Sequence, residues 1–273
     1  MRKEYDFSKA KRNPYARHLN AQIERLRRMK DEDIDLSDIP EITDWSTAVV
    51  GKFYRPRIAV YCADIGAVKS NHFGWYGATP SSEATSGTDI HQLVEAVAGN
   101  LKKRQPVALG FECPLFVPLA DEPSKLTASR HGEGNRAWSA AAGPSALATG
   151  LVEVLWILRE IRRNCGDNER AFLDWKSFCK RCSGLFLWEA FVSGKRESRT
   201  HIGDAELAVR SFCDSLPDPE SASAVRCADG TEVYSLIGAA LLRSGWAADV
   251  RLLSRPCLVI KSAWGTSRPG FAG

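Results

Sequence analysis

The feature that most constrains the fold is a short apolar run that ends in a carboxylate and a glycine turn. Residues 58–63 are rich in the β-branched and aromatic side chains typical of a strand, and Asp64 follows them directly. Ile65 and Gly66 then begin a turn, and residues 71–77 predict a second strand. We therefore expect a hairpin that presents Asp64 at one end of its first strand.

The elements after this hairpin predict an α/β sheet. An amphipathic helix over 89–103 precedes an apolar strand over 107–112, and Pro114 ends that strand with Glu112 at its tip. Strand, helix and strand in this order are typical of a crossover unit in a sheet with parallel strands. The remaining pattern predicts helices over 145–163, from 203 and over 231–246, and strands over 185–190 and 258–260.

Four acidic residues stand at strand tips or at a helix start, where an α/β sheet gathers functional groups: Asp64, Glu112, Glu189 and Asp204. Carboxylates gathered in this way can hold Mg²⁺ or Mn²⁺, which activate water and stabilise the leaving oxygen in phosphodiester hydrolysis. We expect Asp64, Glu112 and Asp204 to be metal ligands and Glu189 to be an auxiliary acid or ligand. Each also has a structural interpretation on its own, as a turn cap, a strand-edge acceptor or a helix N-terminal acid.

The polar segment 118–144 predicts a long loop beside this edge of the sheet. Guanidinium and ammonium groups bind phosphate oxygens, and glycines 132 and 134 let the loop backbone approach a ligand. The predicted phosphate or substrate contacts are Lys69, Arg130, His131, Asn135 and Arg136. His201 is open to three interpretations, as proton shuttle, ligand or surface residue. Trp138 is the tryptophan we expect to be exposed, and therefore the candidate platform for a stacked base.

Residues 1–56 differ from the rest of the chain and predict a separate, largely extended and helical tail. They are polar and charge-dense, with a basic helix expected over 15–30 and an acidic run after it. Asp38-Ile39-Pro40-Glu41 and Gly51-Lys52-Phe53-Tyr54-Arg55-Pro56 resemble the N-terminal part of BrnA-type antitoxins. In that family a ribbon-helix-helix DNA-binding unit follows, whereas here the Asp64 strand follows. The resemblance therefore implies an interaction tail for a protein partner, without autorepression.

Residues 57–273 form the second predicted domain, and its acidic motifs resemble another family. Ala63-Asp64-Ile65-Gly66, Gly110-Phe111-Glu112-Cys113-Pro114, Trp188-Glu189-Ala190 and His201-Ile202-Gly203-Asp204-Ala205 are similar, in type and order, to an uncharacterised bacterial family of predicted nucleases with a ribonuclease H-like fold. The resemblance implies a mixed sheet flanked by helices and a metal-dependent nuclease acting on DNA or RNA. The chain departs from the family in having Glu206, rather than a second Asp, close to Asp204.

Two other functions fit the same motifs. Asp64-Ile65-Gly66 with Lys69, and Asp229-Gly230-Thr231, resemble the phosphate-binding hairpins of actin-like ATP-dependent phosphotransferases. That architecture needs two domains facing a cleft, for which residues 57–273 are a short chain. The other function is a catalytically inactive ribonuclease H-like module that binds a partner through residues 1–56.

Composition constrains the location and the partners. The formal charge of +4 over 273 residues permits a nucleic-acid partner without requiring one. No apolar run approaches the roughly 20 residues that span a bilayer, and the charged start lacks a signal peptide, so we expect a cytoplasmic protein without a membrane partner. The eight cysteines are scattered, and Cys179 and Cys182 lack a second pair that would complete a zinc site.

Overall fold

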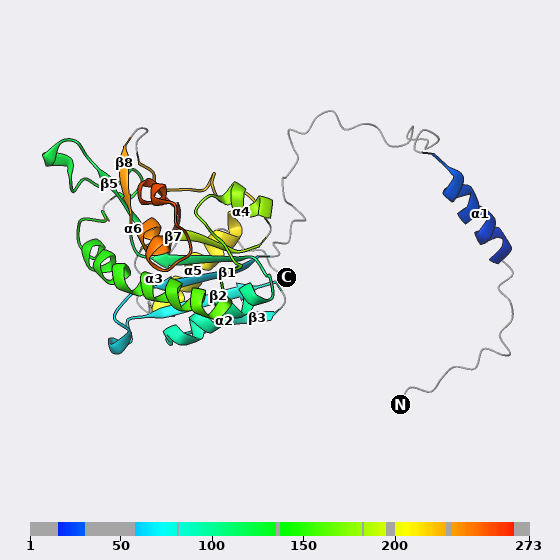
Figure 1. Cartoon of the computed structure of the whole chain (residues 1–273), viewed down its shortest axis with the longest axis horizontal. Coiled ribbons are helices and arrows are strands. Elements are labelled where there is room, and N and C mark those ends of the chain that lie inside the picture. The colour runs from blue at the N-terminus through cyan, green and yellow to red at the C-terminus, as the bar shows by residue number, and fades with distance from the viewer. Residues whose placement is uncertain are drawn as a thin grey trace. The chain divides into compact units, whose positions relative to one another are not determined.

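The computed structural model describes residues 16–30, 58–80, 82–134, 137–181, 183–194, 200–227 and 231–264. The contacts within the chain divide it into two units, 1–50 and 51–273, which are described separately. In the first unit, helix α1 (Ala16–Arg28) confirms the predicted basic helix (Figure 1). The apolar side chains of Ile23 and Leu26 are 43% and 65% exposed. The remainder of the predicted tail lies outside the described residues.

The second unit contains a mixed sheet of seven strands, as the predicted α/β class requires. Strands run in the order β3-β2-β1-β4-β7-β6. Strand β9 also pairs with β7, at residues of β7 that follow those paired with β6. The pairs β1–β2 and β2–β3 are antiparallel, whereas β4, β6, β7 and β9 continue the sheet in parallel with β1. The strands are β1 (Ala59–Asp64), β2 (Gly74–Thr79), β3 (Ser82–Gly87), β4 (Val107–Glu112), β6 (Ala171–Phe172), β7 (Leu185–Ser193) and β9 (Leu258–Ala263).

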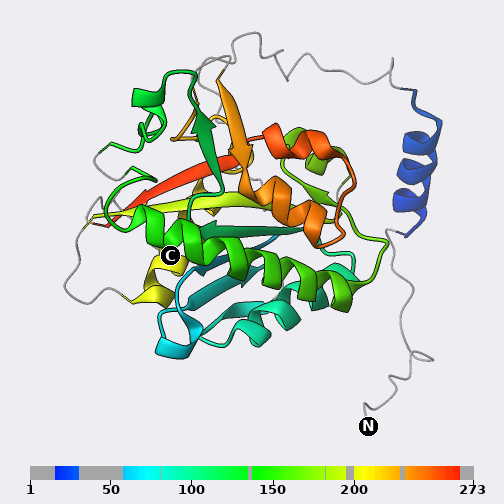
Figure 2. The same ribbon diagram turned by 60° about the vertical axis from the view of Figure 1, so that its left-hand side comes forward.

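Helices cover both faces of this sheet (Figure 2). Helices α2 (Ile90–Lys102), α3 (Gly143–Cys165) and α6 (Leu236–Arg243) pack on one face, and α4 (Trp175–Arg181) and α5 (His201–Asp214) pack on the other. The predicted helices over 89–103 and 145–163 are confirmed, and Asp89 caps α2 by accepting a hydrogen bond from the His91 N–H at 2.8 Å. None of the helices in the described ranges is long and apolar enough to cross a membrane.

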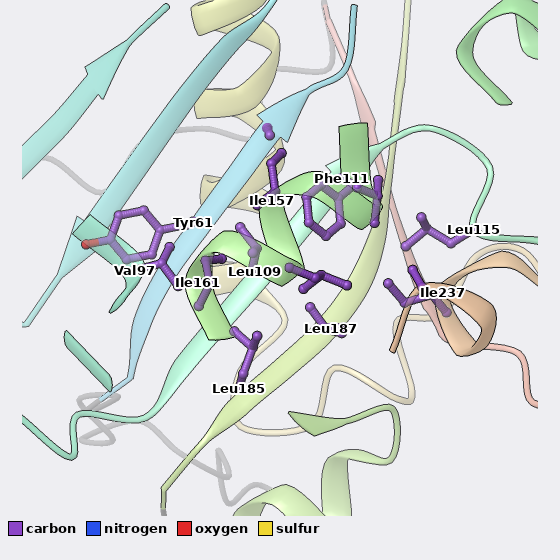
Figure 3. Close-up of a cluster of buried hydrophobic side chains, with 14 of the residues drawn as sticks. Tyr61, Val97, Leu109, Phe111, Leu115, Ile157, Ile161, Leu185, Leu187 and Ile237 are labelled. Atoms are coloured by element: carbon purple, nitrogen blue, oxygen red, sulfur yellow. The ribbon is translucent and has the colours of Figure 1, made fainter. Parts of the chain in front are cut away.

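The central strands are buried on both faces, and successive residues contribute to two separate cores. Tyr61, Leu109 and Leu187 point toward α2 and α3, where they join the cluster in Figure 3. Their neighbours Val60, Ala108 and Phe186 point toward α4 and α5. Because side chains alternate between the faces of a strand, the position of a residue along its strand decides which core it enters. This alternation also decides where each acidic residue at a strand tip points.

The second half of the chain departs from the prediction at several elements. Residues 232–235 form strand β8 (Glu232–Ser235), which pairs with β5 (Phe116–Leu119), so the helix predicted over 231–246 begins only at Leu236. The side chains of β8 alternate between exposed and buried, which is the strand period. Strands β3 and β6 and helix α4 were not predicted. The described residues also include three short 3-10 helices: η2 (Val68–Ser70), η3 (Pro123–Lys125) and η4 (Val250–Ser254).

Candidate metal centre

Strands β1 and β4 place two carboxylates next to each other. They are parallel neighbours in a register that pairs Ala63 with Phe111 and Asp64 with Glu112. Residues paired in register point to the same face of a sheet, and the alternation described above directs Asp64 and Glu112 toward the α5 face. This pairing confirms the prediction that the two acids lie together at the tips of their strands.

Helix α5 supplies the third carboxylate from its first turn. Thr200 caps the helix by accepting a hydrogen bond from the Gly203 N–H at 3.0 Å. The start of α5 packs so closely on β2 that a Cβ at Gly74 would lie 2.6 Å from the Ile202 nitrogen. This close approach brings Asp204 to the strand tips, and the helix N-terminus favours its negative charge.

The three acids form a compact group. One carboxylate oxygen each from Asp64, Glu112 and Asp204 lie within 4.8 Å of one another. Asp64 and Asp204 are buried, with 8% and 3% exposure. Hard divalent cations hold oxygen ligands at about 2.0–2.6 Å, so oxygens at this spacing can share one ion. Glu206, the other acid near the start of α5, pairs instead with Arg210 on the surface.

Two ring nitrogens hold the aspartates in place. His201 Nδ1 lies 2.6 Å from Asp64 Oδ2, and Trp264 donates its indole N–H to Asp204 Oδ1 at 2.6 Å. Such partners around a metal site orient the ligands and hold their shape. His201 therefore contacts the acid cluster through Asp64, and its side chain is 40% exposed. No sequence pattern indicated Trp264, which follows β9 and is brought to the site by the β7–β9 pairing.

Glu189 does not join this cluster, contrary to the prediction that it is an auxiliary acid or ligand there. The register pairs Glu189 with Phe111, one residue before Glu112. Because neighbouring positions on a strand point to opposite faces, Glu189 points away from α5. Its carboxylate instead accepts hydrogen bonds from Arg130 at 2.6 and 2.8 Å and from the Leu115 N–H at 2.9 Å.

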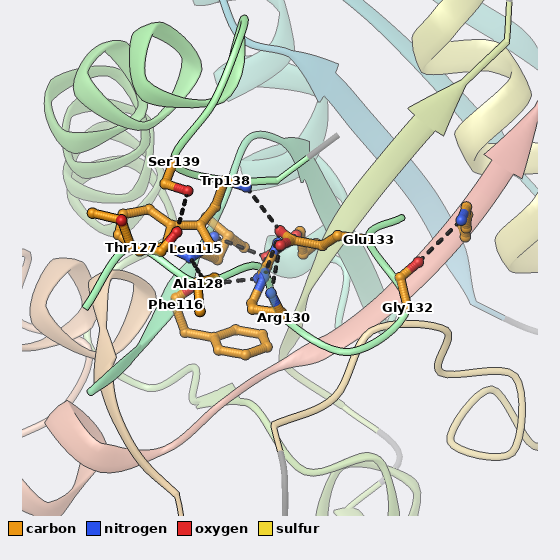
Figure 4. A network of polar contacts seen from close by, with 11 residues as sticks. Leu115, Phe116, Thr127, Ala128, Arg130, Gly132, Glu133, Trp138 and Ser139 are labelled. Atoms are coloured by element: carbon orange, nitrogen blue, oxygen red, sulfur yellow. Dashed lines mark hydrogen bonds and ion pairs between the residues drawn. The ribbon is translucent and has the colours of Figure 1, made fainter. Parts of the chain in front are cut away.

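Arg130 is the centre of a buried ionic network rather than an open phosphate contact. Its side chain is fully buried between Glu189 and Glu133, whose Oε1 accepts from the Arg130 Nε at 2.8 Å (Figure 4). The guanidinium also donates to the Phe116 carbonyl at 3.2 Å and stacks on the Phe116 ring. Burial alone would lower the pKa of Arg130, but the charges of Glu189 and Glu133 raise it, so the group stays cationic.

Two of the other predicted phosphate contacts are described by the structure, and neither lies at the acid cluster. Lys69 is exposed in η2, and His131 is exposed and forms a backbone bridge with Arg226. Neither residue lines the cavity beside the acids. Asn135 and Arg136 lie outside the described residues. Other described residues of segment 118–144 do line this cavity, among them Arg130, Glu133 and Trp138.

A cavity of about 530 Å³ opens beside the three acids. Its lining includes Asp64, Glu112, Asp204 and His201, and also Trp138 with five alanines between 137 and 146. Among the described residues, five carboxylates and one arginine line the cavity, because Glu133, Glu189 and Arg130 also contribute to its wall. An anionic ligand would be repelled from such a site until cations neutralise it.

Glu153 is a further acid near the cluster that the sequence did not single out. Its pKa is raised from an ordinary 4.5 to about 7, mainly by burial; a hydrogen bond from the Gly66 backbone lowers the pKa and the negative charge of Asp64 raises it. Its Oε2 atom is buried without a hydrogen-bond partner among the described residues. Glu153 lies on α3, which passes next to the Asp64 turn, so tertiary packing alone places it there.

No family model, curated protein or solved structure matches the chain. The resemblances to BrnA-type antitoxins and to ribonuclease H-like predicted nucleases therefore remain predictions from the sequence. What the site can do is argued below from its own residues.

Proposed function

We propose that residues 57–273 form a ribonuclease H-like nuclease that hydrolyses nucleic-acid phosphodiesters with Mg²⁺ or Mn²⁺. The observation that carries the proposal is the group of three carboxylate oxygens within 4.8 Å of one another, from β1, β4 and α5, beside a cavity. The antiparallel β1–β2–β3 unit, followed by parallel β4 and β7, is also the sheet order we associate with that fold.

The chemistry of the donors fits a hard divalent cation. Asp64, Glu112 and Asp204 offer only oxygen ligands, which Mg²⁺ and Mn²⁺ prefer over softer sites. A bound ion would supply activation of water and stabilisation of the leaving oxygen. The neutralised cluster would then accept a phosphate that the five carboxylates of the cavity otherwise repel.

The chain's own residues would keep this site ready for the ion. His201 and Trp264 fix the orientation of Asp64 and Asp204 through bonds of 2.6 Å each. Glu112 is held beside Asp64 by the β1–β4 register. Because these positions are set by packed strands and a helix rather than by a loop, the ligands need little rearrangement to bind a cation.

The proposal predicts that Asp64→Asn removes both tight Mn²⁺ binding and Mn²⁺-dependent cleavage of a mixed-sequence oligonucleotide. The substitution keeps the shape of the side chain and removes the charge that holds the cation. Titration calorimetry measures the first effect, and gel analysis of oligonucleotide products measures the second. Asp204→Asn should behave in the same way, and Glu206→Gln on the same helix is the matched control, because Glu206 pairs with Arg210 outside the cluster.

Each alternative function has its own outcome in the same experiment. Mn²⁺ binding that tightens with ATP rather than with oligonucleotide would favour the actin-like phosphotransferase. No Mn²⁺ binding in any run would contradict the nuclease and favour a partner-binding module. In that case the exposed apolar side chains of α1, Ile23 and Leu26, would be the first surface to test with a protein partner.

A further inference from the structure

We propose that the cavity beside the acid cluster receives a single unpaired nucleotide, with its base against Trp138, so that the preferred substrate is single-stranded. This inference rests on the proposed function, because it assigns the phosphate of that nucleotide to the cations at Asp64, Glu112 and Asp204. It extends the proposed function to the apolar residues that line the same cavity and that the metal site does not use.

The two kinds of lining residue suit the two parts of a nucleotide. The acids Asp64, Glu112 and Asp204 suit a phosphate once cations are bound, and Trp138 with five alanines adds apolar surface to the same cavity. Aromatic rings serve proteins as stacking surfaces for bases of any sequence, because every base has a π face. A wall of small side chains beside one large ring leaves room for a flat group to lie on that ring.

The ring of Trp138 is held in place before any ligand arrives. Its indole N–H donates to the Ala128 carbonyl at 2.9 Å, and its backbone N–H donates to Glu133 Oε1 at 3.2 Å (Figure 4). The next residue, Ser139, bonds the Thr127 carbonyl at 2.6 Å. The indole edge is therefore used for hydrogen bonding within the loop, whereas the partly exposed ring contributes to the cavity wall.

The buried ionic network connects this wall to the sheet. Glu133 binds both the Trp138 backbone and Arg130, and Arg130 binds Glu189 at 2.6 Å on β7. Buried charges are costly unless fully paired, so a loop closed by this network has few alternative positions. The structure thus holds an apolar aromatic wall at a fixed position relative to the strands that carry Asp64 and Glu112.

The size of the cavity favours an unpaired nucleotide over a duplex. A volume of about 530 Å³ lies in the range of about 300–1,000 Å³ that is typical of sites for one small ligand. A base within a duplex could enter only after unstacking and unpairing, which lowers its affinity. A single strand or an unpaired end avoids that cost, and we expect it to bind at least about tenfold more tightly than the duplex of the same sequence.

The test is binding of a fluorescent 12-nucleotide phosphorothioate thymidine oligomer in Mn²⁺, followed by anisotropy, with a uridine oligomer and a duplex as further probes. We expect Trp138→Leu, which keeps apolar bulk without an aromatic face, to weaken single-strand binding about tenfold, and Trp138→Phe to retain most of it. Leu126→Ala is the matched control, because Leu126 is exposed on the same loop and does not line the cavity. Mn²⁺ binding measured by calorimetry should be the same in all these variants, which also reports on their folding.

Equal single-strand affinity in wild type, Trp138→Leu and Trp138→Phe would overturn this inference, as would a duplex bound as tightly as the single strand. If Asp64-dependent cleavage persists in that case, the nuclease stands and only its substrate assignment fails. If single-strand binding depends on Trp138 but no Mn²⁺-dependent cleavage is found, the nuclease fails and the nucleotide-binding cavity stands. Trp138→Leu could also lose Mn²⁺ binding because it misfolds. Two comparisons then still test the inference: wild type with Trp138→Phe, and single strand with duplex.

Discussion

Glu112 ends β4 and Glu189 lies in the middle of the neighbouring parallel strand β7, and their side chains enter opposite environments. Glu112 joins Asp64 and Asp204 on the α5 face, where the three acids have oxygens within 4.8 Å of one another. Glu189, one register position away and on the other face, is bound by Arg130 at 2.6 and 2.8 Å. Glu133 shares the same arginine. The sheet therefore carries two acidic groups, one built around the buried Arg130 and one whose aspartates contact His201 and Trp264.

This difference separates a structural role from a binding role. A carboxylate with a buried arginine partner is already satisfied, and removing that partner leaves an uncompensated charge. A group of carboxylates held close together gains free energy when a divalent cation binds to it. The predictions below test this comparison through the sign and the size of the stability changes.

The largest effect should come from Arg130→Met. It leaves Glu133 and Glu189 buried without their cation, and we expect a loss of about 3–5 kcal/mol in the free energy of unfolding, measured by guanidinium chloride denaturation. Arg251→Met is the control, since the Arg251 side chain is 80% exposed beside Asp249 and exposed pairs contribute little to stability. Similar losses in the two variants would contradict the structural role of the network.

In the absence of metal, removing a charge from the acid cluster should raise the free energy of unfolding instead of lowering it. In EDTA, Asp204→Asn relieves repulsion and keeps an acceptor for the Trp264 indole, so we expect a gain of about 1 kcal/mol in unfolding free energy. With Mn²⁺ at about 100 times its Kd, the wild type should gain about 2.7 kcal/mol, and the variant much less. Glu206→Gln should respond to Mn²⁺ as the wild type does. Equal Mn²⁺ responses in wild type and Asp204→Asn would contradict the metal centre.

How far the site could be predicted depends on which physical information the sequence carries. Asp64 and Glu112 were readable because an apolar run followed by an acid and a Gly or Pro turn marks a strand tip. The direction of Glu189 was not readable, because β7 is buried on both faces and its sequence does not alternate. Without alternation, the sequence does not reveal which face each residue occupies.

The partners of these acids depend on contacts between distant parts of the chain. Arg130 precedes Glu189 by 59 positions, and Trp264 follows Asp204 by 60. No local spacing rule relates such pairs, so they appear only in the folded structure. The same limit explains β8, where pairing with β5 overrides a pattern we interpreted as helix. The polar edge strand β3 lacks the apolar run that predicts strands.

Glu153 belongs neither to the acid cluster nor to the buried ionic network around Arg130. It is half-buried, and one of its carboxylate oxygens lacks a hydrogen-bond partner among the described residues. Its pKa is raised from 4.5 to about 7, first by burial and also by Asp64. A raised carboxyl pKa means that the folded state retains a proton that the unfolded state has lost, so stability falls as the pH rises from 4.5 to about 7.

Glu153→Gln lacks this titration, and its stability relative to wild type should therefore rise between pH 5 and pH 8 in EDTA. We expect about 1 kcal/mol, because solvent screens a half-exposed group, measured by urea denaturation at pH 5, 6.5 and 8. A constant difference across this range would contradict the raised pKa. Repeating the series with Mn²⁺ sharpens the comparison, because a cation at Asp64 offsets the charge that helps to raise the pKa of Glu153. The pH dependence should then shrink in the wild type and stay unchanged in the Asp64→Asn background, where no cation binds.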